Sequence, residues 1–510
     1  VSTKCKQSRK PVRKTEFSNS EGFDKNRNLY LLELFLIIIC CFFFQQSQLY
    51  HDNQNLYLLH ALSQLDFGNL NFDWMSQTID PFPVFTAFAK LSINLFGKEI
   101  LYIYFVIISF IYVFSLYKIS LIATKYKPTI LRLFFFFIFF TVLVGTKKYL
   151  SYGVARQYLL GTYFQPSSFG ILILLSIYLF LKKRNFQASV MLAFASTFHP
   201  TYLLVSLFIF AGYLFVLFRE DKTKAFKIAV FQLVSVLPVT IYSFITFSST
   251  SPEITAQAKD ILVNFRIPHH AKFDCWFGLP DVYRITITLI SLIIIRKTRL
   301  FPVIAIAFGL SATLTFAQVI SGSNGLALLF PWRVSVVLVP ISASIIIASA
   351  IQIISARFKK IGNKKIILPI QIILFLLIFG LTIPRIKHFS NLFSENHNKH
   401  EKIYSWIKNN SESSNLYLIP KEQSDFRIKT ETPILADRKS HPYKDVEVIE
   451  WHKRLQISDR YFNSDTDSCN TLKSIIEKYG VTHIYSNNKS KTTVCPQMQK
   501  IFSDSNHAVY

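Results

Sequence analysis

The sequence predicts a mainly helical membrane protein, in which a polytopic domain of about eleven spans is followed by a small soluble α/β domain on the outer face. The first observation is the composition, which is 51% hydrophobic with 50 Phe but only 15 Gly among 510 residues and has a mean hydropathy of +0.32. Soluble enzymes of this length are less apolar. The second is a change near Arg385 to the composition of a water-soluble module. We therefore divide the chain into a basic tail (1–28), a membrane domain (29–384) and an outer domain (385–510).

Apolar stretches that can cross about 30 Å of hydrocarbon as helices occupy most of the membrane domain. They are expected at 29–45, 101–121, 133–146, 164–181, 186–199, 201–218, 228–248, 283–295, 300–320, 334–354 and 366–384. Several are short, and only the polar break at His199 and Pro200 separates the fifth from the sixth. Ten to thirteen spans therefore also fit the sequence.

Basic residues mark alternate loops and give the orientation. The net charge is +26, but most Lys and Arg residues lie between apolar stretches, which argues against nucleic acid as a partner. Basic clusters occur in the tail and at 125–127, 182–184, 219–227, 296–299 and 357–365. Eleven spans place all six clusters on one side, which is the cytoplasmic side by the positive-inside rule. The N-terminus is then cytoplasmic, and the long loops and residues 385–510 lie on the outer face.

The first outer loop, about 46–100, is long and acidic, with no Lys or Arg before Lys90. Its acidic residues include Asp52, Asp66, Asp73 and Asp80. The segments LYLLHALSQL and PFPVFTAFAKLSINLFG have helical spacing, and the second starts at Pro and ends at Gly. We expect both to lie in the membrane interface, because a further span here would invert every later loop.

Charged residues within the spans are sparse. Glu33 and Lys118 lie near span ends, where snorkelling to the headgroups explains them. An ion-coupled transporter usually carries ionisable groups inside its spans, so this class is disfavoured.

The outer domain is predicted to mix helices and strands. YSWIKN, DVEVIEWHKRL and TLKSIIEKYG have helical spacing, and Gly480 closes the last. NLYLIP and THIYSN are typical of strands, and RIKTETPILAD of a turn and a strand. Cys469 and Cys495 both lie in this domain, where an oxidising outer face permits a disulfide. The sequence leaves both pairing and free thiols open.

Asp52 is the candidate catalytic residue. It lies beside His51 just after the first span, at the start of the outer loop. A carboxylate at this edge can act as a general base toward a hydroxyl acceptor or help to hold a divalent cation. Alternatively, Asp52 caps the helix that follows, because Asp is a favoured N-cap residue. We find no zinc spacing and no nucleotide-cofactor motif, so the cofactor stays unassigned.

Basic residues on the outer side run against the positive-inside bias and form a candidate phosphate site. They are Lys147, Lys148, Arg156, Arg266, Lys272, Arg284 and Arg333. Arg can bind a phosphate through paired hydrogen bonds and stabilise it as a leaving group. For any single residue, anchoring to lipid headgroups is the alternative. Three loops that contribute together favour a phosphate-binding cavity.

Three histidines lie at the same outer level. His199 either hydrogen-bonds a substrate or caps a broken helix before Pro200, and the sequence favours neither. His269 and His270 are adjacent, so they do not face one metal as an i, i+4 pair does. Zinc is therefore not expected here.

Aromatic and acidic residues near the outer surface have two interpretations. Asp274, Trp276 and Trp332 fit either a sugar platform or an interfacial aromatic belt, which is the default. In the outer domain, RKSHPY with Trp451 either closes the substrate site or belongs to the domain. We expect Trp451 to be a core anchor and leave the role of Lys439 open.

Several of these features together resemble the GT-C superfamily of polytopic glycosyltransferases. They are Asp52 just after the first span, the PFPVFTAFAKLSINLFG helix, the HPTYL break, and an outer domain that begins with YSWIKNNSESSNLYLIP. The chain more closely resembles an uncharacterised family of bacterial, often cyanobacterial, multi-spanning proteins. The shared motifs are QPSSFGILILL with Gln165 at its head, STFHPTYLL and FRIKTETPILADRKSHPYKDVEVIEWHKR, and the resemblance covers about 29–490.

GT-C enzymes, the resemblance implies, move a sugar from a polyprenyl-phosphate or diphosphate carrier to a glycan, lipid or protein acceptor and invert the anomeric carbon. By position, Asp52 would be the base. The implied substrate-binding residues are His51, Arg156, Gln165, His199, Arg266, His269, His270, Asp274, Trp332 and Arg333. HDNQ stands where better-studied members carry a paired acidic motif, so metal dependence and catalysis itself stay open. The expected location is a bacterial inner membrane, with the C-terminal domain in the periplasm.

Other functional classes remain open. A transporter or flippase for lipid-linked saccharides, a polymerase-like assembly protein, or a catalytically silent relative would also need an outer basic cavity. None of them has a special need for a carboxylate at position 52. Asp52 therefore discriminates between these classes and a transferase.

Overall fold

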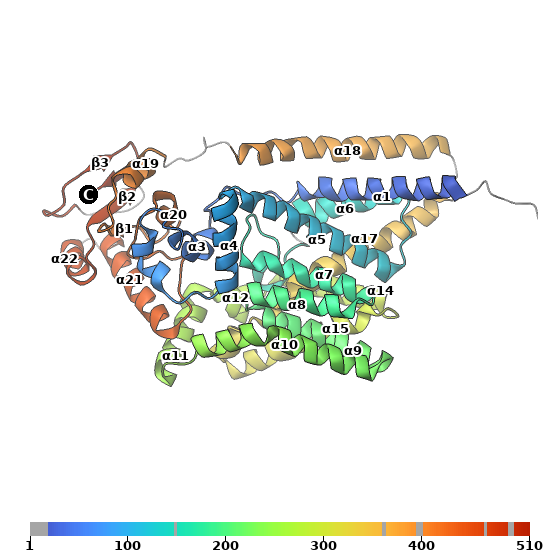
Figure 1. Ribbon diagram of the computed structural model, residues 1–510, viewed down its shortest axis with the longest axis horizontal. Coiled ribbons are helices and arrows are strands. Elements are labelled where there is room, and N and C mark those ends of the chain that lie inside the picture. The colour runs from blue at the N-terminus through green and yellow to red at the C-terminus, as the bar shows by residue number, and fades with distance from the viewer. Residues whose placement is uncertain (1–18, 147–149, 360–363, 394–400, 464–466, 488–493) are drawn as a thin grey trace, which may run out of the picture.

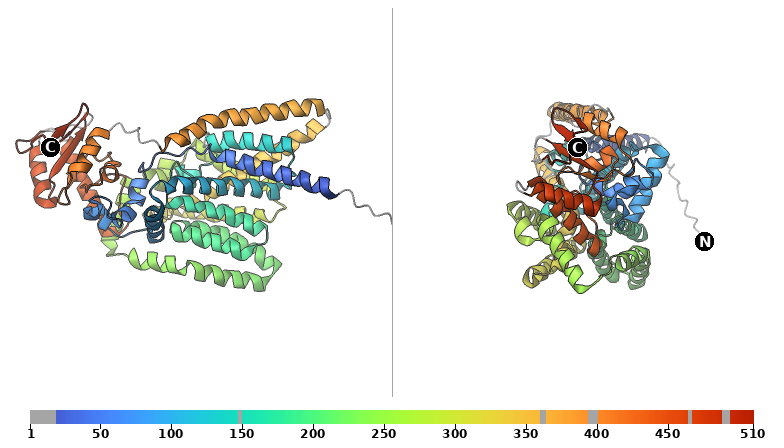
Figure 2. Two further views of the ribbon diagram at one scale, coloured as in Figure 1. Left: turned by 45° about the horizontal axis from the view of Figure 1, so that its top comes forward. Right: turned by 90° about the vertical axis from the view of Figure 1, so that its left-hand side faces the viewer.

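The computed structural model describes residues 19–146, 150–359, 364–393, 401–463, 467–487 and 494–510. Long helices run roughly parallel in one bundle, and the C-terminal part of the chain packs against one end of it (Figure 1). Turned views show the same arrangement, with the small sheet beyond the helix ends (Figure 2). The protein is an integral membrane protein, because its longest helices match the apolar stretches of the sequence.

Six helices within the described ranges are long and apolar enough to cross a membrane. They are α5 (Ile100–Thr124), α9 (Tyr202–Glu220), α10 (Lys222–Thr246), α15 (Leu300–Ser321), α17 (Ser335–Lys359) and α18 (Lys364–Asn391). The other predicted spans also form helices, but these are shorter or less apolar. They are α1 (Asn19–Cys41), α6 (Ile130–Phe140), α7 (Ile171–Leu181), α8 (Asn185–Phe198) and α14 (Leu279–Ile295). The count of eleven is therefore not confirmed and stays a prediction.

Breaks in helix geometry explain two of the shorter helices. The helix α6 continues as a π-helix, η3 (Thr141–Thr146), and α7 is preceded by a 3-10 helix, η5 (Pro166–Gly170). Pro166 opens η5, because proline fits the first turn of a helix and not its interior. Each predicted span is thus divided between two helix types.

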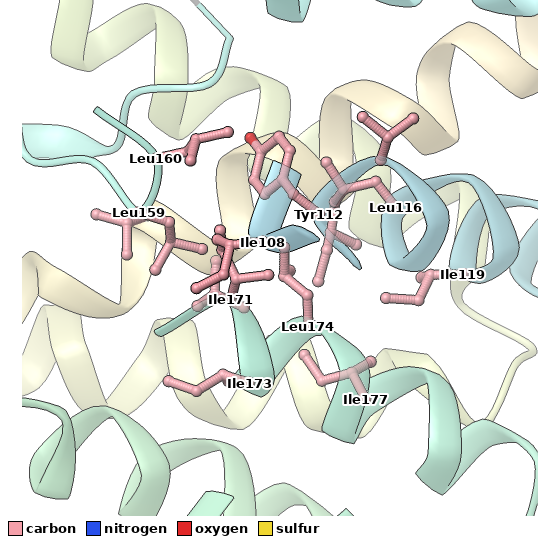
Figure 3. Close-up of a cluster of buried hydrophobic side chains, with 14 of the residues drawn as sticks. Ile108, Tyr112, Leu116, Ile119, Leu159, Leu160, Ile171, Ile173, Leu174 and Ile177 are labelled. Atoms are coloured by element: carbon pink, nitrogen blue, oxygen red, sulfur yellow. The ribbon is translucent and has the colours of Figure 1, made fainter. Parts of the chain in front are cut away.

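The bundle core consists of branched aliphatic and aromatic side chains. Ile108, Tyr112 and Leu116 of α5 lie against Leu174 and Ile177 of α7 (Figure 3). Because positions three and four apart share one face of a helix, this spacing buries one stripe of α5 along its length. The surfaces of α10, α14 and α15 that face away from the core expose apolar side chains, as helices in contact with lipid do.

Two charged residues in the bundle pair with each other. Lys118 Nζ of α5 lies 2.5 Å from Glu33 Oε1 of α1. The sequence analysis explained both charges by snorkelling near the span ends, which stays a prediction. The structure adds that the salt bridge neutralises both charges where the two helices pack.

The first outer loop forms short helices at the end of the bundle. They are α2 (Gln54–Tyr57), α3 (Leu59–Ser63), η1 (Leu70–Phe72), η2 (Trp74–Gln77) and α4 (Pro83–Phe96). As expected, α4 starts at a proline and ends before Gly97, whose φ of 77° suits glycine. It runs across the ends of the other helices (Figure 1). That direction fits a helix in the membrane interface, which stays a prediction.

The C-terminal part builds a four-stranded sheet with helices. Its elements are α19 (Glu401–Asn410), β1 (Tyr417–Leu418), α20 (Phe426–Thr430), α21 (Asp445–Asn463), α22 (Ser468–Tyr479), β2 (His483–Asn487), β3 (Phe502–Ser503) and β4 (His507–Val509). The strand order is β1-β2-β4-β3, in which β1 is parallel to β2 and the other pairs are antiparallel.

The predicted elements of this part are confirmed except at one segment. RIKT forms the helix α20 instead of a turn, and only Ile434 beyond it bridges to Tyr417. Cys469 and Cys495 form a disulfide with Cα atoms 5.5 Å apart, which resolves the open question of their pairing.

A buried ion network joins the sheet domain to the first outer loop. Arg427 donates to Asp73 Oδ2 at 2.9 Å and to Asp437 Oδ2 at 2.8 Å, and all three side chains are almost fully buried. Asp73 Oδ2 also accepts from the Ile434 amide at 2.9 Å. Asp73 therefore has a structural role.

A second contact holds the sheet domain to the membrane domain beyond α10. Asp445 accepts from the Thr250 amide at 2.8 Å and from the Thr255 hydroxyl at 2.7 Å. Burial raises the pKa of Asp445, but these hydrogen bonds outweigh it and lower the pKa to about 2. Trp451 is fully buried beside Ala258. The expectation for Trp451 as an anchor is confirmed, but the anchor lies at the contact between the two parts.

Candidate functional site

Asp52 lies on a strained turn between α1 and α2. Its φ is +52° and that of Tyr50 is +62°, values that non-glycine residues rarely adopt. Gln54 holds the turn, since its Oε1 accepts from the Tyr50 amide at 2.9 Å and its Nε2 donates to the Phe164 carbonyl at 3.0 Å. Asn53 is the residue before α2, and no side chain caps this helix. The capping alternative for Asp52 is therefore wrong, and its carboxylate is directed elsewhere.

Two side chains bind the Asp52 carboxylate. Lys439 Nζ lies 2.5 Å from Oδ1, and the Tyr163 hydroxyl donates to Oδ2. Burial raises the pKa of Asp52, but the hydrogen bonds from Lys439 and Tyr163 and the charge of Lys439 outweigh it, so the pKa lies below its ordinary value. Asp52 is an anion at neutral pH. A carboxylate has about four acceptor positions, so it retains room for a further donor.

Lys439 reaches Asp52 from the sheet domain because its loop is fixed at three points. Asp437 Oδ1 accepts from the amides of Lys439 at 2.8 Å and Ser440 at 2.7 Å. The Lys439 carbonyl in turn accepts from Arg266 Nη2 at 2.8 Å. The open question about Lys439 is thus answered, since the RKSHPY loop packs on the candidate site and brings a cation to its carboxylate.

Arg266 is a half-buried cation of the site. It ends η6 (Ile261–Arg266), and burial lowers its pKa, although an Arg stays charged at any physiological pH. Its Nε is buried and has no hydrogen-bond partner in the described part of the chain. This atom is therefore available to an anionic ligand.

Arg333 and His199 form a second polar pair. Arg333 Nη2 lies 3.4 Å from His199 Nε2, and the guanidinium lies 5.2 Å from the centre of the Tyr202 ring. Burial, together with the charge of Arg333, lowers the pKa of His199 well below its ordinary value. Neutral His199 accepts from Arg333 and donates through Nδ1 to Thr201 Oγ1 at 2.9 Å. Its side chain therefore positions Arg333, while its backbone amide donates to the Ala195 carbonyl at 3.2 Å, so His199 also caps the C-terminal end of α8.

An aromatic wall connects these groups. The Phe82 ring centre lies 4.9 Å from that of His199, 5.1 Å from Tyr57 and 5.5 Å from Tyr443 of the sheet domain. The first outer loop, the α8–α9 turn and the sheet domain thus meet at one aromatic cluster beside the basic residues.

Arg156 and the histidine pair extend the basic region. Arg156 is exposed at the end of η4 (Val154–Arg156), and His270 Nδ1 lies 2.7 Å from the Ala155 carbonyl. Burial lowers the pKa of His269, and the charges of Arg266, Arg156 and Lys439 lower it further. The charges of cations from three separate segments therefore all reach His269. The lowered pKa values leave both His269 and His270 neutral at physiological pH.

Several predicted site residues lie elsewhere or are structural. Asp274 is exposed on α13 (Phe273–Trp276), away from the Lys439 and Tyr163 contacts of Asp52, and Arg284 pairs with Asp281 at 3.1 Å. Gln165 donates to Ser167 Oγ at 2.7 Å and caps η5. The Asp80 carboxylate accepts from the Phe82 amide at 2.8 Å, so it shapes a turn. Lys147 and Lys148 lie outside the described residues.

The two tryptophans pack together instead of forming an exposed belt. Trp276 and Trp332 are buried with Val154 and Ala155, and both line a small cavity that His270 also borders. His51 is exposed near Asp52, with its ring centre 6.3 Å from that of Tyr163. In the part of the chain that the structure describes, no three His, Cys, Asp or Glu side chains form a group that could hold a metal ion.

Sequence reasoning missed Tyr163, Tyr57 and Tyr443, and also the part that Arg427 plays. Tyr163 lies between Arg156 and Gln165, two positions that had been singled out, but a tyrosine in a loop carries no spacing signal. The role of Arg427 could not be predicted for another reason. Its partner Asp73 is distant in sequence, and its partner Asp437 lies beyond a turn.

Comparison with known proteins gives one partial match. A family described as a domain of unknown function (DUF6798) matches residues 398–457. The matched segment contains Arg427, Asp437 and Lys439, which connect the sheet domain to the candidate site. The search of curated proteins finds no match to the chain.

Proposed function

We propose that this protein is an inverting glycosyltransferase that moves a sugar from a polyprenyl-phosphate-type lipid to a hydroxyl acceptor on the outer face of the membrane. The observation that carries the proposal is one ionised carboxylate, Asp52, facing basic groups that converge from several segments. The resemblance to the GT-C superfamily supports the same reaction. In that orientation the N-terminal tail is cytoplasmic and the sheet domain lies outside, in the periplasm if the membrane is a bacterial inner membrane.

The roles follow from what such a transfer needs. A bond forms between the acceptor oxygen and the anomeric carbon while the bond from that carbon to the phosphate oxygen breaks. Asp52 would take the acceptor proton, and Tyr163 would hold the carboxylate in place. The leaving phosphate needs positive charge more than a proton, which Arg266, Arg333 and Arg156 would supply.

Lys439 has two possible partners in this reaction. Lys439 Nζ lies 2.5 Å from Asp52 Oδ1 and neutralises its charge. A phosphate that enters between the two would attract the ammonium and leave the carboxylate free to accept from the acceptor hydroxyl. Lys439 would thus hold the base as an anion until the donor binds.

The test is transfer of label from polyprenyl-phosphate sugars into glycans or protein, in membranes that contain the wild type, Asp52→Asn or Asp66→Asn. Asp66 is the matched control, because it is an exposed acid of the same loop and also has a positive φ. We expect Asp52→Asn to lower the rate by about 10²-fold or more and Asp66→Asn to leave it unchanged. Undiminished transfer by Asp52→Asn, or movement of the lipid-linked sugar across vesicles without any transfer, would refute the proposal.

A further inference from the structure

A second pocket lies at the outer ends of α1, α5 and α18, on residues that do not belong to the Asp52 site. The space of about 320 Å³ in and before it includes open solvent. Phe42, Phe44, Phe105 and Phe389 line its apolar part. Gln46, Arg385 and His388 provide its polar part. In both ribbon views α18 runs along the edge of the bundle, where lipid would reach it (Figures 1 and 2).

Gln46 is buried although the structure shows no hydrogen bond to its side-chain amide among the described residues. It is only 4% exposed, and neither amide atom, Nε2 or Oε1, has a hydrogen-bond partner among the residues that the structure describes. Its backbone carbonyl accepts from His388 Nε2 at 2.9 Å, which fixes the residue against α18. A buried amide that lacks partners is unfavourable, so a ligand with hydrogen-bonding groups would stabilise this arrangement.

Arg385 supplies an unneutralised cation to the same pocket. It is half-buried, and its guanidinium lies 6.0 Å from the centre of the Phe43 ring. Across the described residues, no carboxylate forms a salt bridge with it. A cation and an amide donor at the mouth of an apolar slot match an anionic oxygen group that is attached to an apolar chain.

We propose that this pocket binds the phosphate headgroup of an anionic membrane phospholipid. Arg385 lies near the C-terminal end of α18, close to the end of α1, so it lies at the level where headgroup phosphates occur. Exposed Ile103, Ile107 and Ile386 on α5 and α18 provide apolar surface for the acyl chains. The headgroup would hold α18 to α1 and α5, while Phe42 and Phe389 contact the glycerol end of the chains.

The test is native mass spectrometry of the full chain in a neutral detergent, with phosphatidylglycerol as the titrated lipid. Arg385→Gln removes the charge, and Lys387→Gln is the matched control, because Lys387 is an exposed cation of the same helix that does not line the pocket. We expect Arg385→Gln to weaken binding about tenfold, as loss of a charge-assisted hydrogen bond does, and Lys387→Gln to change it by less than about twofold. Equal losses in the two variants, or no loss in Arg385→Gln, would overturn the proposal.

A second variant separates binding from folding. Gln46→Leu removes the unpartnered amide, so we expect the lipid-free protein to keep or raise its Tm while its affinity for phosphatidylglycerol falls. Diacylglycerol, which lacks the phosphate, should not bind, and excess inorganic phosphate should not displace the lipid. Binding of diacylglycerol with the same affinity, displacement by phosphate alone, or full affinity in Gln46→Leu would each contradict the assignment.

Discussion

Arg427 is expected to hold the sheet domain on the first outer loop. In Arg427→Met, Asp73 keeps its hydrogen bonds from the Met75 amide at 2.8 Å and the Ile434 amide at 2.9 Å, and Asp437 keeps two backbone donors. Both carboxylates nevertheless remain buried without their shared cation. Removal of one partner from a buried ion pair costs about 3–5 kcal/mol. We therefore expect docking to weaken by about 4 kcal/mol, which corresponds to about 10³-fold more frequent opening.

Hydrogen–deuterium exchange of the full chain in detergent measures this opening. The amides of Ile434 and Asn69 report docking, since the first donates to Asp73 and the second to the Glu431 carbonyl at 2.9 Å. The Ile484 amide, which donates to the Tyr510 carbonyl within the sheet at 2.9 Å, reports whether the domain stays folded. We expect the first two amides to exchange about 10³-fold faster in Arg427→Met, while Ile484 keeps its protection.

Arg438→Met is the matched control. Arg438 pairs with Glu422 at 3.3 Å, and both side chains are about half exposed or more. Such a surface pair is worth at most about 1 kcal/mol, so the exchange rates should change by less than about fivefold. Equal effects of Arg427→Met and Arg438→Met would refute the reasoning.

The deficit of Arg427→Met should also depend on pH. Burial raises the pKa of Asp437, and without the charge of Arg427, which lowers it, this pKa rises further in the docked state. The docked state then binds a proton more readily, so the deficit is greatest at high pH and shrinks as pH falls through the raised pKa. A deficit that does not vary with pH would show that the loss comes from packing instead of charge.

Two further predictions concern the site and the disulfide. If Asp52 is the base, wild-type transfer falls only as pH drops below the lowered pKa of Asp52. In Lys439→Met the lowering by Lys439 is lost while burial still raises this pKa, so the acid limb of kcat/KM should move to higher pH. An unmoved acid limb would exclude this role of Lys439. Reduction of the Cys469–Cys495 bond, which closes a loop of 26 residues, should lower the stability of the sheet domain by about 3 kcal/mol. Unchanged hydrogen–deuterium exchange across α22 and β2 after reduction would contradict this prediction.

The sequence predicted local features well, because local patterns determine them. Helix α22 ends at Gly480, whose φ of 70° favours glycine, and α4 begins at Pro83, so both boundaries could be read directly. RIKT was misassigned because four residues have no usable period, and burial of Phe426 and Ile428 decided its helical form.

Only some residues of the candidate site could be predicted from the sequence, because the others gain their role from contacts between distant segments. Asp52, Arg266 and Arg333 stood out because charge is unusual at the outer ends of spans. Tyr163 did not stand out and the role of Lys439 stayed open, since both residues gain a role only when their loops meet. The strained turn at Asp52 was equally hidden, because a positive φ depends on Gln54 reaching across to Phe164.

The division of the site between two distant segments sets an order of events during synthesis. Asp52 emerges from the ribosome before the later bundle helices, whereas Lys439 and the Asp437 that orients it emerge after them. A nascent chain with its helices already inserted thus displays a carboxylate that has no cationic partner. Only when the segment that carries Lys439 has folded and docked through Arg427 does the pair form, so the site is assembled after the segments that form the bundle.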